Sequence, residues 1–414
     1  MKRSFRVVQQ RLLQLTLRLY LNNPKLMNAY RKLRAQNKPL ALLVQFMLNT
    51  KPKSFSDSGT YQCINQMKSH DHLILENVKL TGRSRFVNQN DSKYVIDIPA
   101  KTSAGEAILD TYFLQEEVID ICQVEPANGI VRFHSQETQL DLYGKWVTGL
   151  HPSSENWMHF ISEVLPNLLA LTNRLQDQTY GLLLDSCIAK SGRHLLNSIF
   201  PEIPKIFIDY GQVVRVEKLA FDCSETNNYS FFWPRTDQKV LGHYSFNAGN
   251  LQEVRNQILK AYAGVNMGEQ IGLPTKLYIK RKSYFRNITN EGELEQKLVE
   301  AGFKIFTPTE NNLVEQIVLF HSATHVVAQA GASLANMMFM QENSKVLSMS
   351  ANSEWVDYAY FEEYANIFNL DFQVHLGKAP NSTKEKVSLT GSKHHPMNSD
   401  FSINADEVIE WTNI

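Results

Sequence analysis

The stretch Leu277–Met340 constrains the fold more than any other part of the chain, because short apolar runs alternate there with amphipathic segments, and a further apolar run follows it. The apolar runs predict buried strands, and the segments between them have the apolar spacing of helices. The predicted strands are Leu277–Lys280, Phe303–Phe306, His325–Gln329 and Lys345–Met349. Strands that alternate with helices over short connections form right-handed crossovers, so this stretch predicts a parallel sheet.

Residues typical of helix ends mark the boundaries of the helices between these strands. Two Asn-x-x-Glu patterns, at residues 290–293 and 312–315, predict helices that begin with a capping box. Gly302 predicts the end of the first of these helices. The turn Gly331-Ala332-Ser333 predicts the start of a third helix, which continues from Leu334.

Polar and small residues follow the predicted strands at the edge where such sheets bind ligands, outside the carboxyl ends of the strands. Four residues fall at this edge: Arg281, Thr307, Gly331 and Ser350. Ser333 would lie at a helix N-terminus, where backbone N–H groups and the helix dipole favour an anion. Because guanidinium groups bind phosphate oxygens with paired donors, Arg281 and Arg286 are predicted to hold a phosphate or diphosphate.

A further amphipathic helix is predicted to begin near Glu155, where Ser153 or Ser154 can act as the N-cap. Its apolar side chains form one stripe: Trp157, Ile161, Val164, Leu168 and Leu171. His159 and Glu163 fall together on the opposite face, one turn apart. A carboxylate neighbour orients an imidazole and keeps it basic, which suits a general base. The alternative is that both side chains simply face solvent.

Charge is distributed unevenly, although the net charge of the whole chain is zero. The first acidic residue is Asp57, and residues 1–56 carry twelve Lys and Arg residues. This segment is too charged to span a bilayer, but a basic amphipathic helix can lie on an anionic membrane surface. We therefore expect a cytoplasmic protein that can bind the inner face of the plasma membrane through residues 1–55. No nucleic-acid-binding motif accompanies the basic charge, so no nucleic acid partner is expected.

Metal-ligand patterns are missing from the sequence. The four cysteines are scattered without C-x-x-C spacing, which favours free thiols over a zinc site. The chain also has no Asp-x-Asp pair, a common carboxylate pair for a metal ion that bridges to a diphosphate. We expect no metal and no cofactor, with arginines and helix termini supplying positive charge instead.

Several of these residues together resemble glycosyltransferase family 61. The motifs that carry the resemblance are Asn156-Trp157-Met158-His159 with Leu165-Pro166, Tyr278-Ile279-Lys280-Arg281, Arg286, Asn290-Glu291, Glu315-Gln316 and Gly331-Ala332-Ser333-Leu334-Ala335-Asn336. They span about half of the chain. The family usually has His immediately before Gly-Ala, where this chain has Ala330. The resemblance implies an α/β fold of the GT-B type, with two Rossmann-like parallel-sheet domains facing a cleft.

The resemblance also implies an inverting, metal-independent hexosyl- or pentosyltransferase of cell-surface polysaccharide (capsule) biosynthesis. Its partners would be a nucleotide-sugar donor and a glycan or lipid-linked glycan acceptor. His159 and Glu163 are the predicted catalytic residues. The predicted donor diphosphate site consists of Arg281, Arg286, Gly331, Ala332 and Ser333. Further candidates for the cleft are Asn290, Glu291, Gln329 and Asn336.

Four parts of the chain are expected on this basis. They are a basic amphipathic segment (residues 1–55), an acceptor-side Rossmann-like domain (56–250), a nucleotide-sugar-binding Rossmann-like domain (251–376) and a polar tail with a C-terminal helix (377–414). Asn247–Asn250 is the predicted linker between the two domains.

Two other functions fit part of the pattern. Gly331-Ala332-Ser333 resembles a relaxed nucleophile elbow, so Ser333 could serve a serine hydrolase, with Asp357 or Asp371 and His375 completing a triad. Alternatively, Ala330 in place of the usual His is compatible with a non-catalytic GT-B-like scaffold.

Overall fold

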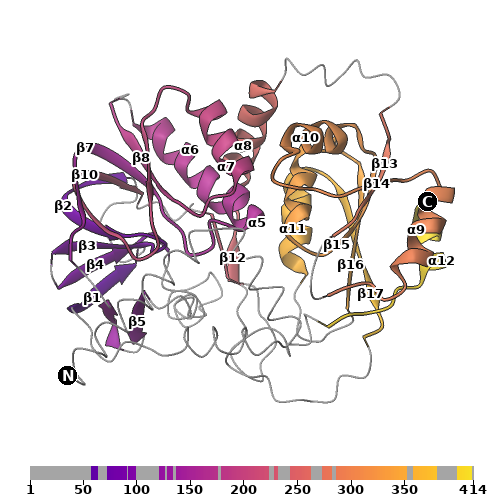
Figure 1. The fold of residues 1–414 in the computed structure, drawn as a ribbon, viewed down its shortest axis with the longest axis horizontal. Helices are drawn as coiled ribbons and strands as arrows, with labels where there is room; N and C mark the ends of the chain where they lie inside the picture. Colours follow the sequence, from indigo (N-terminus) through magenta and orange to yellow (C-terminus); the bar gives the residue numbers. More distant parts are fainter. Residues whose placement is uncertain are drawn as a thin grey trace, which may run out of the picture. The chain divides into compact units, whose positions relative to one another are not determined.

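The computed structural model describes most of the chain between residues 57 and 412. The described ranges are 57–63, 72–90, 92–98, 121–125, 128–133, 137–175, 179–222, 228–231, 243–262, 273–281, 286–351, 358–379 and 399–412. The predicted amphipathic segment, residues 1–55, lies outside them, as does most of the predicted polar tail. The described residues divide into two compact units: residues 57–189 with 202–231, and residues 190–201 with 243–412 (Figure 1).

The first unit is built on one ten-stranded sheet. Its strands are β1 (Asp57–Cys63), β2 (His72–Thr81), β3 (Phe86–Asn90), β4 (Lys93–Ile96), β5 (Cys122–Glu125), β6 (Ile130–Phe133), β7 (Leu140–Gly149), β8 (Gly181–Asp185), β9 (Lys205–Ile208) and β10 (Val213–Asp222). They follow the order β5-β6-β1-β4-β3-β2-β10-β7-β8-β9. Only β10-β7-β8-β9 and the pair β1-β4 are parallel. The sheet is therefore mixed, and the prediction of a wholly parallel sheet in this region is wrong.

The chain connections explain the mixture of directions. Only two residues join β3 to β4, and so short a connection allows antiparallel neighbours alone. Helical segments join β7 to β8 and β8 to β9 instead, because consecutive parallel neighbours need a long crossover. These segments are α5 (Trp157–His159), η3 (Phe160–Val164) and α6 (Leu165–Arg174) between β7 and β8, and α7 (Lys190–Ile199) between β8 and β9.

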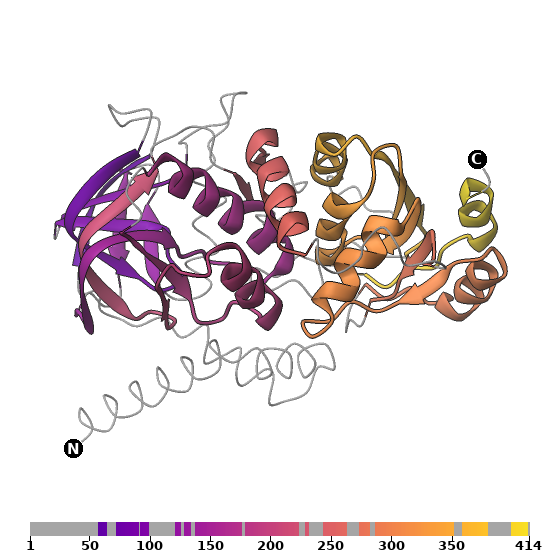
Figure 2. The same cartoon turned by 90° about the horizontal axis from the view of Figure 1, so that it is seen from above.

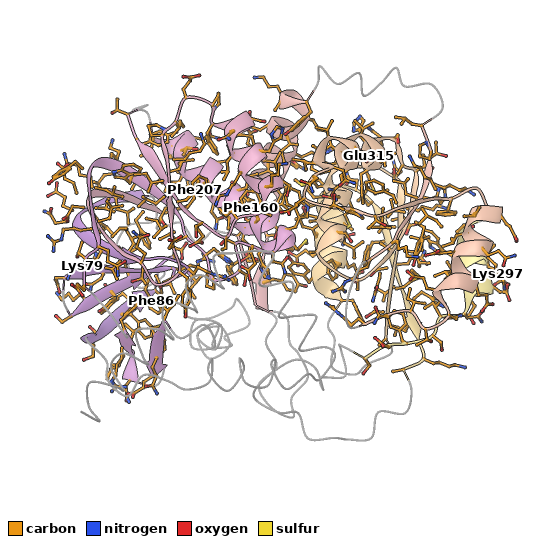
Figure 3. All side chains as sticks on the ribbon, in the orientation of Figure 1. Lys79, Phe86, Phe160, Phe207, Lys297 and Glu315 are labelled. Atoms are coloured by element: carbon orange, nitrogen blue, oxygen red, sulfur yellow. The ribbon has the colours of Figure 1, made fainter. Side chains whose placement is uncertain are left out.

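Two hydrophobic clusters lie among the described residues of the first unit. One surrounds the antiparallel strands and contains Phe86 and Phe133, whose ring centroids are 6.0 Å apart in an edge-to-face contact. The other contains Trp146 of β7 and Leu183 of β8. Every residue of β8 is buried, as expected of a parallel strand that is covered on both faces. Figure 3 labels Phe86 of the first cluster and Phe160, a buried residue of η3.

The second unit contains a five-stranded, wholly parallel sheet. Its strands are β13 (Lys276–Ile279), β14 (Lys304–Phe306), β15 (His325–Gln329), β16 (Lys345–Ala351) and β17 (Asp371–Gly377), in the order β14-β13-β15-β16-β17. The four strands predicted between residues 277 and 349 and their parallel arrangement are confirmed. The structure adds β17 at the edge beside β16.

Helices cover both faces of this sheet. The helices of this unit are α7, α8 (Ala248–Ala261), α9 (Glu291–Glu300), α10 (Leu313–Ser322), the 3-10 helix η4 (Ala332–Phe339), α11 (Ala359–Ile367) and α12 (Ala405–Thr412). In Figures 1 and 2, α9 and α12 lie on one face of the sheet and α10 and α11 on the other. The predicted third helix after Gly331 thus exists, but it is a 3-10 helix rather than an α-helix.

Asparagine residues begin the two predicted helices, but their side chains do not make the predicted capping hydrogen bonds. Asn290 and Asn312 are the N-cap residues of α9 and α10, yet neither side chain makes a capping hydrogen bond. Both capping boxes are therefore wrong. The predicted linker Asn247–Asn250 is also part of a helix, since Asn247 caps α8 and accepts a hydrogen bond from the N–H of Asn250 (2.9 Å). Two short strands, β11 (Tyr229–Phe231) and β12 (His243–Ser245), precede α8.

The C-terminal segment packs against the second unit, as predicted. Phe401, Val408 and Trp411 join the hydrophobic cluster on the α9 face of the sheet. Lys297 of α9 donates a hydrogen bond to Asp406 of α12 (2.6 Å; Figure 3 labels Lys297). Among the residues that the structure describes, no helix has the length and apolar character needed to span a bilayer.

Candidate active site

A buried carboxylate organises the turn that follows β7. Asp185, the last residue of β8, accepts hydrogen bonds from the backbone N–H groups of Arg83 and His151 (both 2.7 Å) and from the hydroxyl of Ser154 (2.8 Å). Burial raises the pKa of Asp185 to about 6, although Arg83 and these donors favour its charged form. Asp185 therefore ties the turn at His151 to the carboxyl end of the parallel strands.

Arg83 holds the same turn from the other side. It has a left-handed backbone conformation (φ 66°), which is uncommon for a residue with a side chain and points to a structural constraint. Its guanidinium is buried and donates hydrogen bonds to the carbonyl of Pro152 and to the carboxylate of Glu155, the latter at 2.6 Å. The turn at residues 151–155 is thus fixed by two buried side chains.

The helix that carries His159 and Glu163 contains a π turn. It begins with α5, capped by Asn156, whose side-chain oxygen accepts a hydrogen bond from the N–H of Met158 (3.0 Å). The predicted caps, Ser153 and Ser154, are therefore wrong. Residues 160–164 form the π turn η3, a conformation that is frequent at functional sites. The Asn228 side chain donates a hydrogen bond to the carbonyl of Ser162 (2.9 Å), which satisfies one backbone group of this turn.

Glu163 lies at the centre of the site and its side chain is fully buried (0% exposed). Its Oε1 accepts a hydrogen bond from Nδ1 of His159 (2.5 Å), and its Oε2 lies 3.1 Å from Nε2 of His151. The face that carries His159 and Glu163 therefore points into the protein, which rules out the alternative in which both residues face solvent. A buried charge of this kind is tolerated only where hydrogen bonds compensate it.

Arg85 adds a positive charge to this centre. One guanidinium nitrogen, Nη1, lies 4.0 Å from Oε2 of Glu163. The rest of the guanidinium forms a two-point contact with Asp97, with Nε 2.6 Å from Oδ1 and Nη2 2.8 Å from Oδ2. Paired bonds of this kind orient the arginine plane as well as stabilise it. Asp97 thereby fixes the position of the arginine beside Glu163.

Hydrogen bonding determines which ring nitrogens carry protons. The N–H of Ser153 donates to Nδ1 of His151 (3.1 Å), so the proton of this imidazole is on Nε2 and faces Glu163. Because Nδ1 of His159 donates to the carboxylate, Nε2 is the basic nitrogen of His159. The His159 side chain is 14% exposed and that of His151 only 4%. His159 is therefore the more accessible of the two histidines.

The environment shifts the pKa values of the three residues in different directions. Burial lowers the pKa of His151, against the opposing effect of Glu163. Burial also disfavours charge on His159, but the Glu163 carboxylate outweighs it and raises the pKa of His159. Although burial alone would favour the neutral acid, the two imidazoles hold the pKa of Glu163 well below its ordinary value. The site is therefore an ionised carboxylate between a neutral histidine and a more basic one.

The predicted donor residues lie at the carboxyl edge of the sheet in the second unit. Arg281, Thr307 and Gly331 lie beyond the last residues of β13, β14 and β15, and Ser350 is the next-to-last residue of β16. Nη1 of Arg281 donates a hydrogen bond to the carbonyl of Ala330 (3.2 Å). A Cβ atom on Gly331 would lie 3.3 Å from the same nitrogen. The lack of a side chain at Gly331 therefore lets the guanidinium lie over this turn.

The other three residues predicted to bind the donor diphosphate are Ala332, Ser333 and Arg286. Ala332 and Ser333 form the first turn of η4 and are half-buried. Arg286 has a left-handed backbone conformation (φ 60°). Burial lowers the pKa of Arg286 to about 10, and the nearby phenol of Tyr358 opposes this shift. At this pKa the guanidinium remains charged at neutral pH.

The remaining cleft candidates have structural contacts, with one exception. Asn290 makes two hydrogen bonds to the backbone of Ile403, at 2.8 Å and 3.0 Å. Glu291 accepts a hydrogen bond from the hydroxyl of Tyr278 (2.9 Å), and Asn336 donates one to Gln316 (2.8 Å). Gln329 is the exception: it is buried, and its side-chain nitrogen has no hydrogen-bond partner among the described residues.

Asp371 and His375, the described residues proposed for a serine hydrolase, do not form a triad with Ser333. Asp371 is the first residue of β17, at the amino edge of the sheet, whereas Ser333 follows the carboxyl edge. Nε2 of His375 lies 3.2 Å from the carboxylate of Glu407. The third candidate, Asp357, lies outside the described residues. Within the described ranges, no group of three or more His, Cys, Asp and Glu side chains is arranged to hold a metal ion.

Comparison with known proteins identifies the class of enzyme. Residues 157–347, from the start of α5 to within β16, match the family model described as Glycosyltransferase 61. The protein is accordingly a glycosyltransferase (EC 2.4). The match also supports glycosyltransferase family 61 in particular, the family that the motifs resemble. A search of curated proteins finds no match to the chain.

The sequence did not predict five residues of the site around Glu163. They are Arg83, Arg85, Asp97, His151 and Asp185. Two signals in the sequence could have drawn attention to some of them. Asp185 ends a wholly apolar strand, and the pair Arg83 and Arg85 lies in the turn after another strand. Charged residues at such positions are candidates for a site at the edge of the sheet.

Proposed function

We propose that the protein is an inverting, metal-independent glycosyltransferase. It transfers a sugar from a nucleotide-sugar donor to a glycan or lipid-linked glycan acceptor in cell-surface polysaccharide assembly. The match to residues 157–347 supports the transferase class. The pair of His159 and Glu163, with a 2.5 Å contact between them, is the observation that carries the mechanism.

In this mechanism, Nε2 of His159 removes the proton from an acceptor hydroxyl group. The acceptor oxygen then attacks the anomeric carbon, and the bond from this carbon to the nucleoside diphosphate breaks. Since attack and departure occur on opposite sides in one step, the configuration inverts. Glu163 orients the imidazole and stabilises the imidazolium ion that forms, while the acceptor provides the nucleophile.

The carboxyl edge of the second sheet is the proposed donor site. Arg281 over the Ala330–Gly331 turn, together with Ser333 and Arg286, would bind the diphosphate and stabilise its charge as it leaves. We propose that residues 56–250 bind the acceptor and residues 251–376 the donor, in the organisation known as GT-B. Residues 1–55 would attach the enzyme to the inner face of the plasma membrane, where a lipid-linked acceptor is available.

Donor screening of the purified full-length protein tests this function. We expect one nucleoside diphosphate or nucleotide sugar to raise the melting temperature equally with and without EDTA. The same donor should support transfer by the unaltered protein but not by His159→Ala. His194→Ala is the matched control, because His194 is an exposed histidine on α7. Donor binding without any transfer would favour the non-catalytic scaffold, and covalent labelling of Ser333 by a fluorophosphonate would favour the hydrolase.

A further inference from the structure

We infer that His151 is a positioning residue, which holds the Glu163 carboxylate in place for His159. This inference rests on the proposed function, in which His159 is the base. His151 is not part of the helix that carries the other two residues, and it enters the site from the turn after β7. Its ring centroid lies 5.8 Å from that of His159, with Glu163 bonded to both rings.

The two hydrogen bonds of the His151 ring show which of its nitrogens donates and which accepts. The backbone N–H of Ser153 donates to Nδ1 of His151 at 3.1 Å. A neutral imidazole with an acceptor Nδ1 must carry its proton on Nε2, and this nitrogen lies 3.1 Å from Oε2 of Glu163. His151 therefore donates to the carboxylate and leaves the other oxygen, Oε1, for His159.

Burial separates the roles of the two histidines. The side chain of His151 is only 4% exposed, so it does not meet the acceptor directly. Its backbone is fixed as well, because its N–H donates to the buried Asp185 at 2.7 Å. A donor anchored at both its backbone and its side chain stabilises one position of Glu163. Its effect on catalysis must therefore pass through Glu163 to His159.

The charged and titratable groups around His151, Glu163 and His159 come from four parts of the first unit. Arg85 lies 4.0 Å from Glu163 and is itself bound to Asp97. Glu155 acts on His159 from the preceding turn and favours its charged form. From β11, which packs against η3, Tyr229 contributes a phenol that burial keeps neutral by raising its pKa.

Loss of the hydrogen bond from His151 to Glu163 would shift the pKa of His159 in a definite direction. With one hydrogen bond fewer, the negative charge of Glu163 is less compensated and attracts the proton on His159 more strongly. The pKa of His159 would therefore rise, and the free base would form only at higher pH. The acidic limb of the kcat/KM profile, which reports this ionisation, should move upward with it.

Two substitutions separate donation from packing. His151→Phe keeps a ring of similar size without a donor, whereas His151→Gln keeps an N–H group that can reach Glu163. For His151→Phe we expect the acidic limb to move up by about one pH unit, which lowers kcat/KM about tenfold on that limb. For His151→Gln we expect the limb to stay within a few tenths of a unit of the unaltered protein. KM for the donor should be the same in all three proteins.

Nuclear magnetic resonance of full-length protein labelled in its histidine rings gives a readout without turnover. The His159 signals, identified by their loss in His159→Ala, should titrate about one unit higher in His151→Phe and return in His151→Gln. Equal titration of His159 in all three folded proteins would overturn the role of His151. If instead the titration shifts as expected but His159→Ala remains active, the positioning role stands and the assignment of His159 as the base fails.

Discussion

The two candidate sites differ in how much of their hydrogen bonding the protein itself supplies. In the first unit, Glu163 and Asp185 are fully buried and bonded to side chains or backbone from several elements. In the second unit, Arg281 makes a 3.2 Å bond to a backbone carbonyl, and the buried nitrogen of Gln329 has no partner among the described residues. The carboxylates of the first site are thus held by the protein before a substrate arrives, whereas in the second site the side-chain nitrogen of Gln329 is left for a ligand to satisfy.

This difference has a consequence for substitutions in the two sites. Changes in the first site should affect the chemical step and the stability of the fold together, because the same bonds serve both. Changes in the second should appear mainly in donor binding. Four substitutions test this separation.

Replacement of the buried carboxylate should have the largest effect. In Glu163→Gln, the amide retains one acceptor but turns a donor toward the N–H group of His151 or His159. We expect kcat to fall about 10³-fold, within the range of general-base catalysis, and the melting temperature to fall as well. Donor KM should not change. Steady-state kinetics and calorimetry measure these quantities, with exposed Glu300→Gln on α9 as the control. A large rise in donor KM would contradict the separation.

Replacement of Asp185 should change how stability depends on pH. Its pKa is about 6 in the folded protein against 3.8 ordinarily, so between these values the folded state binds more protons and stability falls as pH rises. The shift corresponds to about 3 kcal/mol over this window. In Asp185→Asn this negative contribution disappears, and the free energy of unfolding should rise more steeply from pH 4 to pH 6. Urea unfolding at several pH values tests this, and parallel curves for both proteins would refute it.

Removal of the arginine at the second site should weaken donor binding. Hydrogen bonds from a charged group to phosphate contribute about 1.5–3 kcal/mol, so Arg281→Ala should lower donor affinity ten- to a hundredfold. Titration calorimetry with the donor measures this directly. The control is Arg215→Ala, since Arg215 is a half-exposed arginine of β10 in the other unit. An unchanged affinity together with a large loss of kcat would place Arg281 outside donor binding.

The smallest effect is expected for Gly331→Ala. The backbone of Gly331 is extended (φ 165°), so alanine meets no conformational penalty there. The added methyl group would lie 3.3 Å from Nη1 of Arg281, the mobile end of a long side chain that can move aside. We therefore expect donor KM to rise only about threefold. A loss as large as that of Arg281→Ala would mean that backbone at Gly331 must touch the ligand.

The second unit was predictable because its pattern is local. Each strand from β13 to β16 is an apolar run followed by a helix, so the parallel direction of these strands follows from the local pattern, although their order β14-β13-β15-β16 does not follow from chain order. The sheet of the first unit depends on long-range pairing instead. β2 lies beside β10, about 140 residues later, and no periodicity within either strand specifies that partner.

The same contrast explains what was found and missed in the first site. His159 and Glu163 are four residues apart on one helix, so their contact follows from helical spacing. His151 and Arg85 reach the same carboxylate from a turn and from the β2–β3 connection. Only the pairing of distant strands brings these residues together. Helical spacing also could not show which way the face pointed, because burial of Glu163 depends on those partners.

The π turn makes the enzyme sensitive to a change in length as well as to changes in chemistry. A π turn contains one residue more per hydrogen-bonded loop than an α turn. Deletion of a single residue between His159 and Glu163 would convert it to an α turn and place the two residues three positions apart instead of four. Such a deletion variant would retain His159, Glu163 and His151 in its sequence, but it would change the spacing that gives the 2.5 Å contact between His159 and Glu163. In a set of natural or designed variants, helix length at this position would therefore separate active from inactive proteins that share all three residues.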